Sequence, residues 1–203
     1  MKTIIFDIDG TLVDTTNIVV KAIHRAIGQV SSMELPTRET RQFRDQYISE
    51  YMKNENILLP DAFEVLSTLK DRGYCLTTAS NCGTQYLNDI LDTQNIRSFF
   101  TSPLCLGSIE GKVKSDILDV HFTYFSKKGA YMVGDRSSDV EAGRAHGIPV
   151  IGCAFGFGPE YEIEDADIKI KSLQDLLTIF KSSDEEIYQT IHIISKTKDR
   201  THK

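Results

Sequence analysis

Short apolar runs and longer amphipathic segments alternate along this chain of 203 residues. The first apolar run covers residues 4–8 and is interrupted only by Asp7, which is typical of a strand buried on both faces. Similar runs predict further strands at residues 74–79, 99–101, 130–133, 149–152 and 167–170. Strands that alternate with helices of about a dozen residues predict a doubly wound parallel sheet in an α/β fold.

Helical spacing of apolar residues fills the stretches between these runs. It predicts helices at residues 61–72, 84–91, 114–125, 138–146 and 172–180. Two more helices are predicted earlier, one after Asp14-Thr15-Thr16 and one from about residue 37 to residue 54. We therefore expect a small helical insert at residues 15–57, a core made of residues 1–14 and 58–181, and a polar tail at residues 182–203. A further helix is predicted within that tail, around residues 185–194.

Two carboxylates interrupt the end of the first strand. Asp7 and Asp9 are two residues apart, so both side chains point to the same side of the strand, and Gly10 then ends it. Two acids on one side of a buried strand repel each other and lose hydration. Such a cost usually persists where a cation or a reaction uses the charges. We therefore hypothesise that this pair holds a divalent metal ion and attacks phosphorus.

Polar residues follow two other predicted strands in the same way. Ser80 comes at the end of the strand predicted at residues 74–79, and Asp135 comes at the end of the strand predicted at residues 130–133. The carboxyl ends of parallel strands lie at one edge of the sheet, and ligands bind outside that edge. We therefore expect Asp7, Ser80 and Asp135 to converge on one site.

Four motifs carry these polar residues, and each would be a weak signal by itself. They are Asp7-Ile8-Asp9-Gly10-Thr11, Thr78-Ala79-Ser80-Asn81, Lys114, and Gly134-Asp135-Arg136-Ser137-Ser138-Asp139. All four in this order, after matching elements, resemble the haloacid dehalogenase-like hydrolase superfamily. Residues 59–80 and 146–158 are similar to its phosphoglycolate phosphatase-like branch in particular.

The resemblance implies a role for each acidic residue. Asp7 would attack phosphorus and carry an aspartyl-phosphate. Asp9 would protonate the leaving oxygen and then activate water, while its backbone carbonyl binds the metal. Asp135 would complete, with Asp7 and Asp9, an all-oxygen site suited to Mg²⁺. Asp139, one helical turn later, would contact these residues and hold them in position.

Phosphate binding is expected from residues at two helix starts. The hydroxyl of Ser80 and the backbone N–H groups that follow it would hold phosphate oxygens. Asn81 either orients the phosphate or closes the turn. Lys114 would supply a fixed positive charge; it is preferred to Lys112 because Lys114-Ser115-Asp116 is the better match to the family's Lys-Pro-x pattern.

The implied activity is Mg²⁺-dependent hydrolysis of a small phosphorylated metabolite. The acidic side chain of Asp9 favours phosphate-ester chemistry, because dehalogenases of this superfamily lack an acidic residue at that position. The alternatives are a phosphomutase, a nucleotide- or pyrophosphate-directed relative, and a non-catalytic binding protein on the same scaffold. In this family the insert forms a cap that selects the substrate, and here the cap is short. Arg38, Arg41 and Arg44 lie on one helical face, so either one of them meets a second anionic group of the substrate or the face is solvated.

Composition excludes several other classes of protein. The formal net charge of −6 offers no overall attraction for nucleic acid. Four cysteines without metal-binding or CxxC spacing are read as free thiols of a cytoplasmic protein. Asp7 and Asp9 fall inside what would be the apolar part of a signal peptide, and no run is long enough for a membrane span. The pattern does not specify an oligomeric state.

Overall fold

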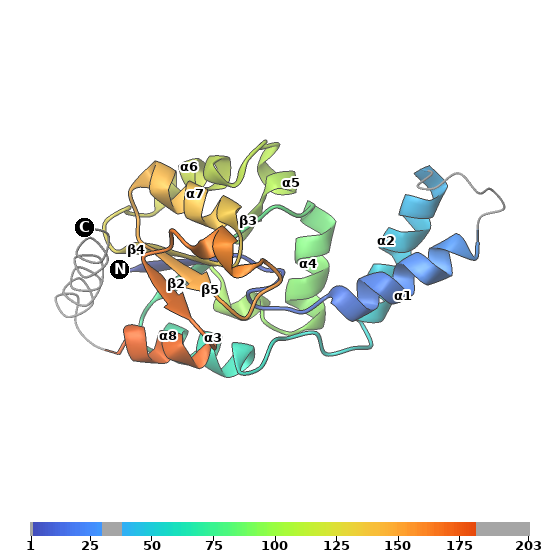
Figure 1. Ribbon diagram of the computed structural model, residues 1–203, viewed down its shortest axis with the longest axis horizontal. Coiled ribbons are helices and arrows are strands. Elements are labelled where there is room, and N and C mark those ends of the chain that lie inside the picture. The colour runs from blue at the N-terminus through green and yellow to red at the C-terminus, as the bar shows by residue number, and fades with distance from the viewer. Residues whose placement is uncertain (1, 30–37, 182–203) are drawn as a thin grey trace.

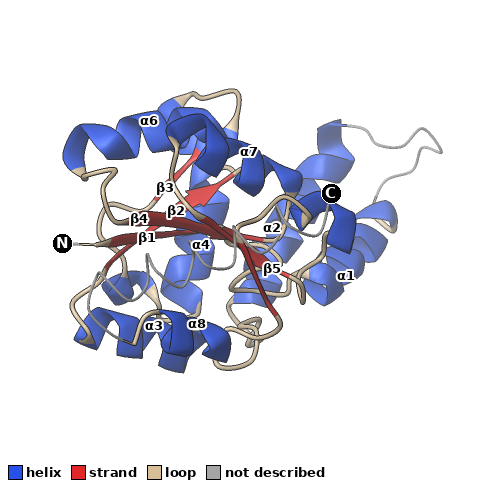
Figure 2. Ribbon diagram, turned by 60° about the vertical axis from the view of Figure 1, so that its left-hand side comes forward, coloured by secondary structure: helices blue, strands red, loops and turns tan. Residues whose placement is uncertain are grey.

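The structure is a computed structural model that describes residues 2–29 and 38–181. Its centre is a six-stranded sheet in which every pair of neighbours is parallel, with strand order β3-β2-β1-β4-β5-β6 (Figures 1 and 2). The strands are β1 (Thr3–Phe6), β2 (Cys75–Ser80), β3 (Leu104–Cys105), β4 (Ala130–Gly134), β5 (Val150–Cys153) and β6 (Ile168–Ile170). The predicted α/β fold with a doubly wound parallel sheet is confirmed.

The first strand lies in the middle of this sheet and is buried on both faces. It pairs with β2 on one side and β4 on the other. Ile4 and Phe6 pack into the larger of two apolar clusters, whereas Ile5 packs into the cluster on the opposite face. Each fully buried side chain of this kind contributes about 1.5–3 kcal/mol. Burial from both sides explains why the run is continuously apolar rather than alternating.

Helices cover both faces of the sheet. Helices α6 (Lys114–Tyr124) and α7 (Ser137–His146) lie on one face, and α3 (Ala62–Asp71) and α8 (Gln174–Ile179) lie on the other (Figure 2). Helix α4 (Thr84–Thr93) contributes to the larger apolar cluster. Short elements complete the chain: α5 (Leu106–Ile109) and the 3₁₀ turns η1 (Arg97–Phe99) and η2 (Glu160–Ile163).

Two helices extend away from the sheet. They are α1 (Thr16–Ile27) and α2 (Arg38–Met52), which pack against each other at one end of the molecule (Figure 1). The two segments that join them to the core run side by side: Asp14 N donates to Ile57 O at 2.8 Å and Leu59 N donates to Leu12 O at 2.9 Å. We retain residues 15–57 as the proposed limits of the cap, with residues 1–14 and 58–181 as the proposed core.

One predicted strand is wrong. Residues 99–101 do not form a strand: Arg97–Phe99 is a 3₁₀ turn, and Phe100 makes only an isolated bridge to Leu76. The edge strand lies further on, at Leu104–Cys105, where it pairs with Ala79 and Ser80. The apolar run at 99–100 has another cause, because the Phe99 ring packs edge-on against Phe63 and the Phe100 ring against Phe6.

Two further predictions concern the end of the second strand and a helix in the C-terminal tail. The second strand runs to Ser80, so the serine expected just at its end is its last residue. The helix predicted around residues 185–194 lies outside the described residues. Among the helices that the structure describes, none combines the length and the apolar character needed to cross a membrane.

Candidate active site

The carboxyl ends of β1, β2 and β4 meet at one edge of the sheet, as predicted. Asp7, Ser80 and Asp135 come from these three ends and line one cleft of about 800 Å³. The cleft is also lined by Asp9, Asn81 and Lys114, so it gathers every predicted site residue except Asp139, which lies just behind it.

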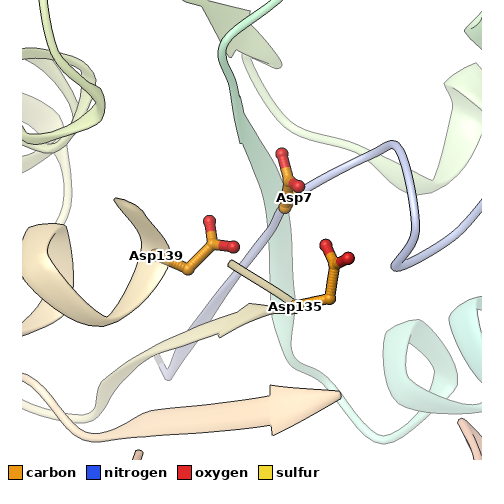
Figure 3. Close-up of side chains that lie close together, drawn as sticks. All are labelled: Asp7, Asp135 and Asp139. Carbon is orange, nitrogen blue, oxygen red and sulfur yellow. The ribbon is translucent and has the colours of Figure 1, made fainter. Parts of the chain in front are cut away.

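Three carboxylates form a cluster, two of them in the cleft and the third just behind it. Asp7, Asp135 and Asp139 each offer one oxygen, and these oxygens all lie within 4.8 Å of one another. Figure 3 shows the three side chains close together, with Asp7 after β1, Asp135 after β4 and Asp139 on α7. All three residues are buried. Like charges this close repel strongly, so the cluster requires positive charge in its neighbourhood.

Lys114 supplies part of that charge. Its Nζ lies 2.9 Å from Asp7 Oδ1 and 2.5 Å from Asp139 Oδ1, and only 3% of the residue is exposed. Burial lowers the pKa of Lys114, but the carboxylates of Asp7 and Asp139 outweigh burial and raise it overall. Lys114 therefore stays charged. Lys112 is exposed, which favours Lys114 as the lysine of the site.

Asp139 contacts Lys114 and the start of α7. Its Oδ1 accepts the ammonium group, and its Oδ2 accepts the backbone N–H of Arg136 at 3.0 Å, which also caps the start of α7. Burial, together with the charge of Asp7, raises the pKa of Asp139 to about 7 although Lys114 opposes the shift. Both oxygens are thus occupied, in keeping with the predicted supporting role.

Asp135 is fixed by a loop that the sequence did not single out as part of the site. Its Oδ2 accepts N–H groups of Phe157 at 2.7 Å and Gly158 at 3.0 Å, both in the loop after β5. Its Oδ1 lies 3.4 Å from the hydroxyl of Thr11. Burial raises the pKa of Asp135. The sequence feature that could have indicated this loop is its glycine-rich stretch at residues 152–158, which is not a dinucleotide-binding pattern. Glycines here let the backbone come close to the Asp135 carboxylate.

Gly10 is required by the close approach of two segments. Its φ is +78°, and a Cβ atom at this position would overlap the carboxylate of Asp135. A glycine is the residue that tolerates both conditions. The turn after β1 can therefore lie directly against the end of β4.

Asp9 occupies a different place from the three clustered acids. Its carboxylate is not part of the cluster, and its Oδ1 accepts hydrogen bonds from Thr15 Oγ1 and Tyr86 OH, both at 2.8 Å. Burial raises the pKa of Asp9, although these two bonds lower it in part. Burial and the neighbouring Asp9 also raise the pKa of Tyr86, so its hydroxyl remains a donor. The sequence pattern does not indicate Tyr86 as a site residue, because an aromatic residue in an amphipathic helix is typical of the core.

Two of the expected phosphate-binding residues, Ser80 and Asn81, also line the cleft. Ser80 is buried at the end of β2, and Asn81 is exposed. The Asn81 side chain donates to Ser138 Oγ at 3.4 Å, which joins the turn after β2 to the start of α7. Gly83 and Thr84, at the start of α4, also line the cleft. Cys82 lies beside them, but burial raises its pKa to about 12, so a thiolate nucleophile is unfavourable there.

The cap contributes to the outer wall of the cleft. Arg44, Asp45, Ile48 and Ser49 of α2 line it, as do Gln85 and Asp89 of α4. Of the three arginines considered as contacts for the substrate, Arg44 is the one whose side chain the structure describes. It forms an ion pair with Asp45 at 2.5 Å. Arg38 and Arg41 have side chains outside the described part of the structure. Arg136 also lines the cleft and lies 3.2 Å from Glu162.

The oxygen donors of the cluster fit a hard divalent cation. Carboxylate oxygens are the ligands that Mg²⁺ prefers. Among the described residues, nothing donates a hydrogen bond to Asp7 Oδ2, and Asp135 Oδ1 has only the long contact with Thr11. These two oxygens are the best placed to bind a cation, whereas those of Asp139 are already used.

Comparison with known proteins identifies the class. A family model described as haloacid dehalogenase-like hydrolase matches residues 4–57 and 32–153. The chain belongs to this family, and the resemblance noted in the sequence is confirmed.

Similar proteins include phosphoglycolate phosphatases among the curated relatives and among the solved structures. A phosphoglycolate phosphatase of Caulobacter vibrioides is 28% identical over 86% of this chain and 88% of its own length. A phosphoglycolate phosphatase of Shigella boydii is 24% identical over 71% of this chain, and the chain spans only 59% of that relative's length. In fold, the crystal structure of a predicted phosphoglycolate phosphatase from Haemophilus somnus superposes with a TM-score of 0.76 at 24% identity, covering 88% of this chain and 97% of the other.

Proposed function

We propose that this protein is a Mg²⁺-dependent phosphatase that hydrolyses a small phosphorylated metabolite through an aspartyl-phosphate. One observation carries the proposal: Asp7 stands at the floor of a cleft with one oxygen held by a buried lysine and the other free of hydrogen-bond donors among the described residues. A carboxylate that is fixed but not fully satisfied is suited to nucleophilic attack. The phosphatase relatives support the same reading.

The proposed reaction has two steps. In the first, an oxygen of Asp7 attacks phosphorus, the ester oxygen departs, and Asp9 gives it a proton. In the second, Asp9 takes a proton from water, which attacks the aspartyl-phosphate, releases inorganic phosphate and restores Asp7. Lys114, Ser80 and Asn81 would hold the phosphate oxygens during both steps. Lys114 can contact the phosphate as well as Asp7 and Asp139, because its ammonium group has three donors.

Asp7 and Asp135 would hold the Mg²⁺ ion through side-chain oxygens, together with the backbone carbonyl of Asp9. When bound, the ion would neutralise charge on the phosphate group and on the acidic cluster. Asp139 would keep Lys114 in place beside them. These assignments are our proposals for the site, and they keep the roles expected from the motifs.

The phosphoglycolate phosphatase relatives suggest a small phosphorylated acid as the substrate. Arg44 is the residue of the cap best placed to meet a second anionic group, but it must first leave Asp45. The cleft also holds Asp45 and Asp89, so a neutral polyhydroxyl group fits this wall as well. A panel of phosphorylated metabolites therefore has to include both kinds of ester.

The first test is turnover of p-nitrophenyl phosphate by the full chain, with Mg²⁺ and with a chelator. We expect release of phosphate only with Mg²⁺, and a loss of more than about a thousandfold in Asp7→Asn. Asp71→Asn, at an exposed position of α3, is the matched control and should keep full activity. Full activity in Asp7→Asn would end the proposal.

Phosphate release from the panel of phosphorylated metabolites, measured with Mg²⁺, separates the alternatives. A phosphomutase would need a bisphosphate activator and would release little inorganic phosphate. A nucleotide- or pyrophosphate-directed relative would prefer those compounds in the panel. A binding protein would release no phosphate from any of them, even with Mg²⁺.

A further inference from the structure

Tyr86 reaches the proposed acid–base residue from outside the four motifs. It lies in α4, lines the cleft, and donates its hydroxyl to Asp9 Oδ1 at 2.8 Å. Thr15 donates to the same oxygen at 2.8 Å. Among the described residues nothing donates to Asp9 Oδ2, so two donors hold one oxygen and leave the other open.

We propose that Tyr86 is a positioning residue that fixes the Asp9 carboxyl group so that its open oxygen, Oδ2, serves the leaving oxygen of the substrate. This inference rests on the proposed phosphatase function. An aspartate side chain has two rotatable bonds, and a proton is transferred efficiently only at hydrogen-bond distance from its acceptor. Holding Oδ1 removes most of that rotation before substrate arrives.

Tyr86 is well suited to this task because its helix is anchored in the core. Leu87 and Ile90, next to it on α4, are buried in the larger apolar cluster. The aromatic side chain is rigid, so the position of its hydroxyl follows the position of the helix. Thr15, in contrast, directly precedes α1 and belongs to the proposed cap. The Tyr86 bond therefore ties Asp9 to the core, independently of the cap.

The role can be separated from a structural one by the choice of leaving group. An alkoxide needs a proton as it departs, whereas p-nitrophenolate departs readily without one, so loss of general-acid catalysis affects alkyl phosphates most. The value of kcat/KM reports the steps through departure of this group. Removing the hydroxyl in Tyr86→Phe should therefore lower kcat/KM for alkyl phosphates far more than for p-nitrophenyl phosphate.

We expect Tyr86→Phe to lower kcat/KM about 10- to 100-fold for the best alkyl phosphates of a panel that includes 2-phosphoglycolate and glycerol phosphates. The loss for p-nitrophenyl phosphate should be less than about threefold. The Michaelis constants should change little. Tyr124→Phe removes the same atom at an 81% exposed position and should match the wild type. Tyr86→Met, which also lacks the donor, should show the same split between the two kinds of ester.

Two results would overturn the inference. One is an equal loss for both kinds of ester in Tyr86→Phe and Tyr86→Met, which would mean a general effect on the fold. The other is unchanged kcat/KM for both esters in a folded variant. In either case the wild type still hydrolyses phosphate esters, so the proposed function stands. A wild type without Mg²⁺-dependent activity would refute the proposed function and, with it, this inference.

Discussion

At the scale of single residues, the site depends on charge compensation among groups that are costly to bury. Asp7, Asp135 and Asp139 bring three carboxylates within 4.8 Å, and Lys114 binds two of them. A buried charge is tolerated when it is paired and hydrogen-bonded. Lys114 thus has a structural role in the free protein in addition to its proposed contact with phosphate.

Replacing this lysine should affect both roles. Lys114→Met leaves Asp7 and Asp139 without their counter-ion, so we expect the free energy of unfolding to fall by about 3–5 kcal/mol. Hydrolysis of p-nitrophenyl phosphate should fall at least about a hundredfold. Urea unfolding and steady-state kinetics measure the two effects. Lys112→Met, two residues earlier and exposed, is the control and should change neither. Loss of activity in Lys112→Met with normal Lys114→Met would reverse the assignment.

At the scale of elements, helix α4 joins the core, the site and the cap. Its first turn lines the cleft, Tyr86 binds Asp9, and Gln94 follows its last residue. The side chain of Gln94 is buried and bonds three backbone groups at the end of α2 and in the segment that follows it: it accepts from Ile57 N and donates to the carbonyl oxygens of Met52 and Glu55. This one side chain replaces the regular hydrogen bonds that an irregular segment lacks.

Removing these bonds should destabilise the protein without touching the site. In Gln94→Met the volume is kept, but backbone groups in a buried place lose their partner, and each such loss costs about 1–3 kcal/mol. We expect the free energy of unfolding to fall by about 2–4 kcal/mol in chemical denaturation. Gln85→Met, at an exposed position of the same helix, should change it by less than about 0.5 kcal/mol. Equal stability of the two variants would contradict this account of Gln94.

At the scale of the whole molecule, the acidic edge of the sheet is expected to couple stability to pH and, through the proposed Mg²⁺ ion, to metal binding. Asp9, Asp135 and Asp139 all have a pKa that burial raises above the usual value of a carboxyl group. A raised folded-state pKa means that the folded protein binds protons more tightly than the unfolded chain does. The resulting stabilisation is present at low pH and is lost as the pH rises through the raised pKa values.

We therefore expect the metal-free protein to have a lower melting temperature at pH 8 than at pH 5, because Asp139 titrates around pH 7. The Mg²⁺ ion proposed for this site would bind the deprotonated acids, so it should raise the melting temperature more at pH 8 than at pH 5. Thermal unfolding at both pH values, with chelator and with Mg²⁺, measures this. Asp139→Asn should show a smaller pH dependence in the absence of metal. A melting temperature that is independent of pH in the chelated wild type would contradict the prediction.

The local pattern was sufficient to predict the parallel sheet and the edge at which the site lies. Strand burial, strand–helix alternation and the positions of Asp7, Ser80 and Asp135 all follow from short-range spacing. The rule that ligands bind at the carboxyl ends of parallel strands then predicts the place of the site. Where local pattern had two explanations, it failed: the aromatic pair at 99–100 read as a strand but serves to pack two rings against Phe6 and Phe63.

The amino-acid sequence by itself determined the family, the order of the elements and the acids at the ends of the strands. Only the tertiary structure decided which groups hold those acids: the N–H groups of Phe157 and Gly158 on Asp135, Lys114 on both Asp7 and Asp139, and Tyr86 on Asp9. The physical reason is that these partners are far apart along the chain. Their contacts depend on how whole helices and loops pack on the sheet, and no local spacing records that.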